Sequence, residues 1–231
     1  MRVLLKQLLL IGSIVISTTV LAQTQPWRLD VNAGLNLSHG HEEADYILAA
    51  QSIKPGFQAG ATASYTVWKG LYIQSGLSIT TKGIKHTKTD TWIGGTNPPV
   101  STTRSSLNLI YLQMPLRMGY DIAITQALSI TAHAGGYLAY GIAGKHTEKT
   151  TTNRDAIPDT KNKTNSFGDH NGGYKSFDNG LSIGAGLQYK QYSLAAIYEY
   201  GLQSIGRSPA NTTNTYKYYN RNLGIVIGYR F

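Results

Sequence analysis

The strongest constraint on the fold is a strict alternation of apolar and polar side chains between Trp27 and Ser38. The apolar positions are Trp27, Leu29, Val31, Ala33, Leu35 and Leu37. Successive side chains of a β-strand point to opposite faces of the sheet. The period of two therefore predicts a strand with one apolar and one polar face.

Further segments repeat this alternation along the chain. They cover residues 57–67, 71–79, 110–120, 128–140, 177–189, 192–200 and 223–231. We expect long polar loops at about 38–55, 83–105, 142–176 and 203–217, and short links at 69–70, 121–127 and 190–191. Eight strands joined alternately by tight turns and long loops are typical of outer-membrane barrels, whose short turns face the periplasm.

The N-terminal segment has the pattern of a secretory signal peptide. A basic head with Arg2 and Lys6 precedes an apolar run from Leu8 to Val20, which ends at Ala22 with small or branched residues at the positions that signal peptidase reads. We expect residues 1–22 to be removed and residues 23–231 to form one domain. The alternative is a retained anchor, but the apolar run is shorter than the ~20 residues that a spanning helix needs.

No long uncharged apolar stretch follows residue 22, so a second membrane helix is not expected. Helices and closed barrels are the structures that satisfy their own backbone hydrogen bonds in lipid. The 25 glycines and 16 tyrosines also suit a barrel. The sequence thus predicts an all-β fold, an eight-stranded antiparallel up-and-down transmembrane β-barrel with long external loops, in the outer membrane of a Gram-negative envelope.

Aromatic residues gather at both ends of the expected strands. On the side of the short turns lie Trp27, Tyr65, Trp68, Tyr120, Tyr189, Tyr192, Tyr229 and Phe231. On the side of the long loops lie Phe57, Tyr140, Phe177, Tyr200, Tyr218 and Tyr219. Two aromatic girdles are expected of a chain that crosses a bilayer repeatedly, because these rings prefer the membrane interfaces.

The other face of the strands should line a filled lumen. Eight strands enclose a space that side chains can fill, and inward glycines leave room for Tyr72, Tyr111 and Tyr137. Inward parity also applies to the charged residues Arg28, Asp30, Arg117, Glu199 and Arg230. Buried charges must pair or meet water. They predict either a polar network that plugs the lumen or a proton or ion path.

Four motifs resemble the porin-family outer-membrane β-barrel domain, often called PorT-like. They are Gly56-Phe57-Gln58-Ala59-Gly60, Gly76-Leu77-Ser78-Ile79-Thr80-Thr81-Lys82-Gly83, Tyr111-Leu112-Gln113-Met114-Pro115-Leu116 and Gly228-Tyr229-Arg230-Phe231. The resemblance covers nearly the whole mature chain. It implies insertion by the barrel-assembly machinery, which recognises a last strand that ends in an aromatic residue, but it implies no single activity. Pro115 lacks an N–H, so a bulge or irregular pairing is expected there.

Chemistry-bearing residues form no recognised catalytic or cofactor motif. Of the six histidines, His133 has inward parity, while His39, His41, His86, His146 and His170 lie in or beside external loops. The run from His39 to Glu43, together with Asp45, could hold a divalent metal, although such residues are more often simply solvated. An enzyme of the outer-membrane rim would need Ser, His and an acid gathered together. We therefore predict no catalytic, cofactor or metal site.

External cations suggest an anionic partner. Without Arg2 and Lys6, 19 of the 21 basic side chains remain against 12 acidic ones, a net charge of +7. The external cations are Lys82, Lys85, Lys88, Arg104, Lys145, Lys149, Arg154, Lys161, Lys163 and Lys175. They could contact lipopolysaccharide phosphates, or be ordinary solvated charge. An exported chain rarely meets nucleic acid, so an anionic lipid surface is the favoured partner.

The function expected from these observations is non-enzymatic. The favoured hypothesis is a barrel with a filled lumen that acts through its external loops in surface interaction or envelope structure. Small-solute transport, lipid chemistry at the rim, and a role as accessory of a secretion or gliding machine remain alternatives.

Overall fold

A computed structural model describes residues 26–44, 50–91, 100–153, 160–167, 173–208 and 215–231. The strands are β1 (Trp27–Ala44), β2 (Ala50–Ser52), β3 (Lys54–Trp68), β4 (Leu71–Thr91), β5 (Val100–Ala123), β6 (Leu128–Thr152), β7 (Thr160–Asn165), β8 (Phe177–Tyr189), β9 (Tyr192–Gly201) and β10 (Tyr216–Arg230). Within these described ranges, no helix is long and apolar enough to cross a membrane. The predicted signal peptide lies outside them.

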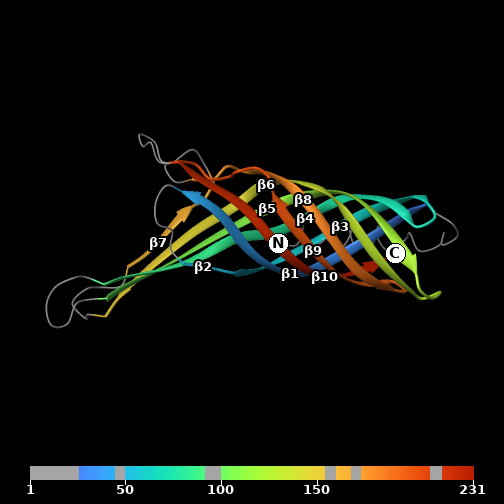
Figure 1. The fold of residues 1–231 in the computed structure, drawn as a ribbon, viewed down its shortest axis with the longest axis horizontal. Helices are drawn as coiled ribbons and strands as arrows, with labels where there is room; N and C mark the ends of the chain where they lie inside the picture. Colours follow the sequence, from blue (N-terminus) through green and yellow to red (C-terminus); the bar gives the residue numbers. More distant parts are fainter. Residues whose placement is uncertain (1–25, 45–49, 92–99, 154–159, 168–172, 209–214) are drawn as a thin grey trace, which may run out of the picture.

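Eight of the strands close into a ring. Following hydrogen-bonded neighbours, the order is β4, β3, β1, β10, β9, β8, β6 and β5, and β5 pairs with β4. The ladders between ring neighbours are antiparallel. The short strands β2 and β7 add to β4 and β6 outside the ring. Figure 1 shows the strands slanting along a long barrel. The predicted eight-stranded up-and-down barrel is confirmed.

Alternation along the strands sorts side chains into an exposed outer face and a buried lumen. On the outer face, Leu35 is 70% exposed and Ile227 is 65% exposed. In the lumen, Tyr111 is fully buried and Tyr72 and Tyr137 nearly so. The predicted parity is therefore confirmed, and an apolar outer belt is what a bilayer requires.

Inward glycines lie directly beneath large side chains, as predicted. A Cβ on Gly119 would come within 2.3 Å of the Tyr72 ring, and one on Gly184 within 2.4 Å of the His133 ring. At these two positions, any larger residue would push a ring out of the packed lumen.

The strands are longer than the alternation predicted. Residues 83–91, 100–105 and 142–152, which we expected to be loop, extend β4, β5 and β6 beyond the apolar belt. Apart from Ile84, Val100, Ile142 and Ala143, their sequences are polar on both faces, and they lack the apolar alternation that marks a membrane strand. They are nevertheless rich in threonine, whose branched side chain favours strands. In Figure 1 this extension projects past the barrel together with β7.

Pro115 interrupts one ladder without a bulge. Pairing between β4 and β5 skips from Ser75–Leu116 to Ser78–Gln113 while the register is kept. The irregular pairing that the missing N–H predicts is thus found there. The register shift of β5 against β6 lies elsewhere, at Ile110 and Tyr111.

Candidate functional site

An ion cluster crosses the lumen at its centre. The Lys82 ammonium of β4 lies 3.2 Å from Glu199 Oε2 of β9 and 3.5 Å from Asp178 Oδ2 of β8. All three side chains are at most 3% exposed. Since β4 and β9 are opposite strands of the eight-membered ring, these contacts tie one wall of the barrel to the other.

Neighbouring side chains complete the cluster. Asn220 donates a 2.9 Å hydrogen bond to Asp178 Oδ2, and Gln113 donates to Glu199. The Lys82 ammonium also lies 3.8 Å from the centre of the Tyr137 ring, within range of a cation–π interaction. Removing ions from water is costly, and this set of partners offsets that cost.

The charged residues predicted to face the lumen are found in ion pairs. Arg117 lies 3.8 Å from Glu199, and Arg230 donates to Asp30 over 2.8 Å. Arg28 pairs with Asp121 near the short turns. The sequence left two interpretations of these charges, a polar network that plugs the lumen and a proton or ion path. The observed ion pairs are what a plugging network requires.

Lys82 and Asp178 were not predicted as lumen residues. We expected Lys82 to lie in an external segment, where it could contact lipopolysaccharide or be ordinary solvated charge, and this external placement was wrong. Its even number puts it in phase with Tyr72 on β4, and β4 continues past the expected loop boundary. Asp178 likewise follows the outward Phe177 directly. Parity could have identified both residues if the strand lengths had been known.

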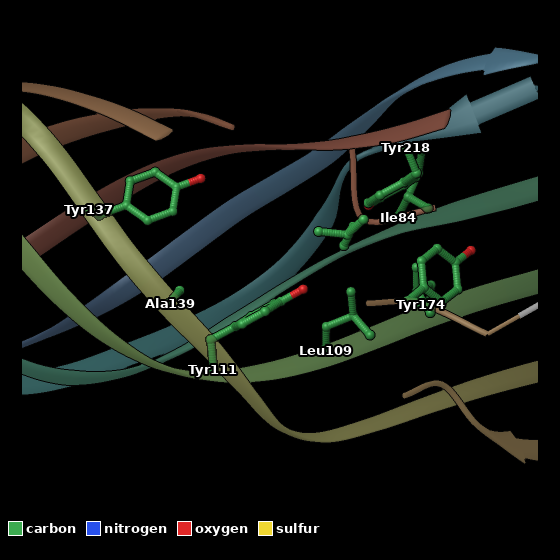
Figure 2. Packing of buried hydrophobic residues seen from close by; sticks show 9 residues of the cluster. Ile84, Leu109, Tyr111, Tyr137, Ala139, Tyr174 and Tyr218 are labelled. Carbon is green, nitrogen blue, oxygen red and sulfur yellow. The ribbon is translucent and has the colours of Figure 1, made fainter. Parts of the chain in front are cut away.

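A hydrophobic cluster closes the lumen on the side of the long connections. Its buried members are Ile84, Leu107, Leu109, Tyr111, Tyr137, Ala139, Tyr174, Ile205 and Tyr218. Figure 2 shows the labelled members converging on the interior of the barrel. Burial of these rings and aliphatic side chains excludes water from the external end of the lumen.

Two connecting segments contribute to this cluster. Tyr174 and Ile205 lie outside the ring strands, and backbone hydrogen bonds hold both: Tyr174 N–H donates to Ser166 O, and Ile205 N–H donates to Tyr218 O. Tyr218 was expected in the outer aromatic girdle. It is instead fully buried, because its even number places it on the inward face of β10.

A polar cavity of about 100 Å³ lies in the other half of the lumen. Its lining includes Gln58, Gln74, Gln113, Arg117, His133 and Gln188. His133 Nε2 has no hydrogen-bond partner among the described protein atoms. A polar cavity of this size is suited to a few water molecules.

The predicted external histidines lie on both faces of the sheet. His39, His41 and Glu43 share the outward face of β1, whereas Glu42 points the other way and contacts His86 at 3.2 Å. In the part of the chain that the structure describes, no three His, Asp or Glu side chains gather as metal ligands. Asp45 and His170 lie outside that part.

One serine–histidine contact exists outside the lumen. Ser105 Oγ lies 2.5 Å from His146 Nε2 across β5 and β6. A nucleophilic site also needs a group that orients the second ring nitrogen. Among the described residues no such hydrogen bond to His146 is found.

Most of the predicted external cations lie on extended strands. Lys85, Arg104, Lys145, Lys149, Lys161 and Lys163 are exposed and belong to β4, β5, β6 and β7. Lys88 lies on the opposite face of β4, 3.1 Å from Asp90. Arg154 lies outside the described residues.

The comparisons with known proteins agree with this fold. The sequence profile of the outer membrane protein β-barrel domain matches residues 21–207. No curated protein sequence matches the chain.

Similar solved structures include three bacterial outer-membrane or surface proteins. Neisserial surface protein A is 12% identical, with 90% of this chain and 98% of that chain covered and a TM-score of 0.39. OprG of Pseudomonas aeruginosa is 14% identical, with 88% and 95% covered and a TM-score of 0.40. A major outer membrane protein of Thermus thermophilus is 12% identical, with 90% and 100% covered and a TM-score of 0.41.

Proposed function

This chain belongs to the outer membrane protein β-barrel domain family and lies in the bacterial outer membrane, and from that premise we propose that it is a closed barrel that acts through its external part. In this proposal the protein is not an enzyme and not an open pore. The strands anchor an external sheet, which meets partners at the cell surface or supports the envelope.

The observation that carries the proposal is that two separate groups of side chains close the lumen. The Lys82–Glu199–Asp178 cluster crosses its centre, and the hydrophobic cluster around Tyr111 and Tyr218 fills its external end. A solute would have to break the buried ion pairs and also displace the packed rings. Both steps cost free energy.

Small-solute transport is the second candidate. The polar cavity of about 100 Å³ favours it, because water already has room in one half of the lumen. Transport would need a further state in which the two connecting segments around Tyr174 and Ile205 leave the barrel.

Several finer assignments belong to the same proposal. We assign the chain to the PorT-like porin group on its motifs, and its last strand, with Tyr229 and Phe231, to recognition by the barrel-assembly machinery. Lipopolysaccharide surrounds the barrel as its outer-leaflet lipid. A role as accessory of a secretion machine would show as co-purification with other envelope proteins.

Single-channel recording in planar bilayers tests the closed lumen. We expect the purified protein to give no steady large-conductance openings, because eight strands leave a lumen that side chains fill. A trimeric porin in the same bilayers serves as the positive control. Steady openings that pass sugars of disaccharide size would overturn the proposal in favour of transport.

A further inference from the structure

Lys54, the first residue of β3, carries a buried charge with one neutral partner. It is 8% exposed, and its ammonium donates a 2.6 Å hydrogen bond to Asn108 Oδ1 of β5. A lysine ammonium has three donors, so two are left for a further acceptor. Among the described residues, no carboxylate lies within ion-pair distance of Lys54. The described part of the chain thus supplies no anion for this cation.

Packing does not explain why this residue is a lysine. A lysine at a membrane surface usually buries its aliphatic stem and leaves its ammonium in water, whereas almost all of Lys54 is enclosed. The stem lies against Gly83, where an added Cβ would come within 3.2 Å of Lys54 Cδ. Methionine or glutamine would fill the same space without the cost of burying a charge. A bound anion would offset that cost.

Two further lysines lie around the same position. Lys145 of β6 is directly opposite Asn108, and Lys85 of β4 is directly opposite Ser106, the next residue on the same face of β5. By strand and residue spacing, their Cα atoms lie about 5 Å and about 8 Å from that of Asn108.

Both of these lysines are exposed. Lys85 also lies near enough to Lys54 for their like charges to interact. Neither Lys85 nor Lys145 forms an ion pair with a carboxylate of the described residues. We call these three lysines, with Ser106 and Asn108, the Lys54 site.

The donors of the Lys54 site suit a phosphate group. Ammonium groups are compact point charges that bind phosphate oxygens. Asn108 accepts from Lys54 through Oδ1, which leaves its two N–H donors, and the Ser106 hydroxyl can also donate. A phosphate offers three strong acceptor oxygens to such a set, and a carboxylate offers only two.

The height of the Lys54 site places it among lipid headgroups. The apolar belt on the outward face of β5 ends at Ile110, and Asn108 is the next outward residue. At about 3.4 Å per residue and a tilt of 35–45°, this step rises about 5 Å along the membrane normal. The headgroup layer is about 5 to 8 Å thick on each side. A phosphate of the surrounding lipid therefore lies at the level of the site.

We propose that the Lys54 site binds a phosphate group of one outer-leaflet lipid, in the lipid A part of lipopolysaccharide. Lys54 would contact the phosphate from beneath, and Lys85 and Lys145 from the exposed side. This inference rests on the proposed function, in which lipopolysaccharide surrounds the barrel, and it adds a specific site where one such lipid is retained.

Native mass spectrometry tests the proposal on the full chain folded in detergent free of lipopolysaccharide. We expect bisphosphorylated lipid A to bind at least tenfold more tightly than dephosphorylated lipid A. Lys85→Gln with Lys145→Gln should weaken binding of the bisphosphorylated form at least tenfold, because hydrogen bonds to charged groups are strong. Lys69→Gln with Lys190→Gln makes the same charge change on exposed residues of the short turns and should weaken it less than twofold.

Lys54→Met distinguishes a ligand-binding residue from a structural one. Without lipid, the variant should unfold at a urea concentration at least as high as wild type, because it removes a buried charge and leaves no carboxylate unpaired. Bisphosphorylated lipid A should raise the unfolding midpoint of wild type, because a ligand of the folded state stabilises it. The same lipid concentration should raise the midpoint of Lys54→Met much less.

Four outcomes would overturn the proposal. They are equal binding of the two forms of lipid A, equal losses in the two double variants, an equal effect of lipid A on the unfolding of wild type and Lys54→Met, and displacement of lipid A by millimolar inorganic phosphate, which would indicate a site for the free ion. Conductance of the same preparation is recorded separately. Failure to bind lipid A in a non-conducting barrel therefore rejects the Lys54 site and leaves the closed lumen standing.

Discussion

At the scale of single residues, the lumen depends on charges that have no access to water. Lys82 is 1% exposed, and its two carboxylate partners come from β8 and β9. A buried ion pair adds little net stability compared with apolar packing, but loss of one partner leaves an uncompensated charge. The cluster thus makes the closed barrel sensitive to single substitutions.

Lys82→Met should destabilise the barrel strongly. It leaves Glu199 and Asp178 buried without their cation, and we expect a loss of about 3 to 5 kcal/mol in the free energy of unfolding. Urea unfolding in lipid vesicles measures it. Lys88→Met, at an exposed position of the same strand, is the control. Adding Glu199→Gln should restore part of the loss, and a Lys82→Met variant as stable as wild type would contradict the cluster's role.

At the scale of strands, the two faces obey different rules. On β10, Ile225 is 45% exposed on the outer face, while the adjacent Gly224 faces Gln58 in the lumen. Side chains on the outer face meet hydrocarbon, and those on the inner face meet polar groups. A substitution therefore has to be judged by its parity.

Ile225→Arg and Gly224→Ser test this parity on one strand. Arginine near the bilayer midplane should cost ~2 to 4 kcal/mol. Serine at 224 should cost less, because a Cβ there meets the flexible end of Gln58 at 2.8 Å. Unfolding in vesicles compares the two. Equal stability of Ile225→Arg and wild type would show that the assigned parity is wrong.

The polar extension of β4 to β6 should respond to acid. Burial lowers the pKa of the His146 imidazole below its ordinary value of 6.5, and nearby His86 lowers it further, against an opposing effect of Glu148. The unfolded chain then binds the proton first as pH falls. His146 therefore contributes stability that is present above about pH 6.5 and declines below it.

Hydrogen exchange measures this effect. Amide protection factors across residues 143–150 should fall between pH 7.5 and pH 5 in wild type, and should change less in His146→Asn. The same experiment distinguishes strand from loop: no protection at pH 7.5 would contradict the observed extension.

At the scale of the whole molecule, closure joins the first and last strands of the ring. β1 and β10 pair from Asp30–Arg230 to Ala44–Tyr216. The ring therefore has no free strand edge along the membrane span, because each of its strands is hydrogen-bonded to a neighbour on both sides. Unfolding has to break the β1–β10 ladder together with the packing of the buried lumen side chains.

A heat-modifiability gel checks that closure. The unboiled protein should migrate differently from the boiled one, because the closed ring resists detergent at room temperature. Identical migration of both samples would contradict a closed barrel. A closed barrel protein whose gel migration is known to change on boiling provides the control.

The sequence by itself determined the strand class, the number of ring strands and the face of nearly every membrane residue. These follow from local rules, because each side chain alternates between lipid and lumen and the period of two is visible in the chain itself. Trp27 through Leu37 already show the outer face of β1.

Only the tertiary structure decided where the polar segments go and which charges meet. Pairing of β4 to β7 depends on register between distant segments, and polar residues leave no apolar pattern to read. The meeting of Lys82 with Glu199 depends on barrel closure, which sets residues 117 positions apart in sequence face to face. The alignment of Arg104, Lys149 and Lys161 has the same cause, since register alone brings these like charges into one row.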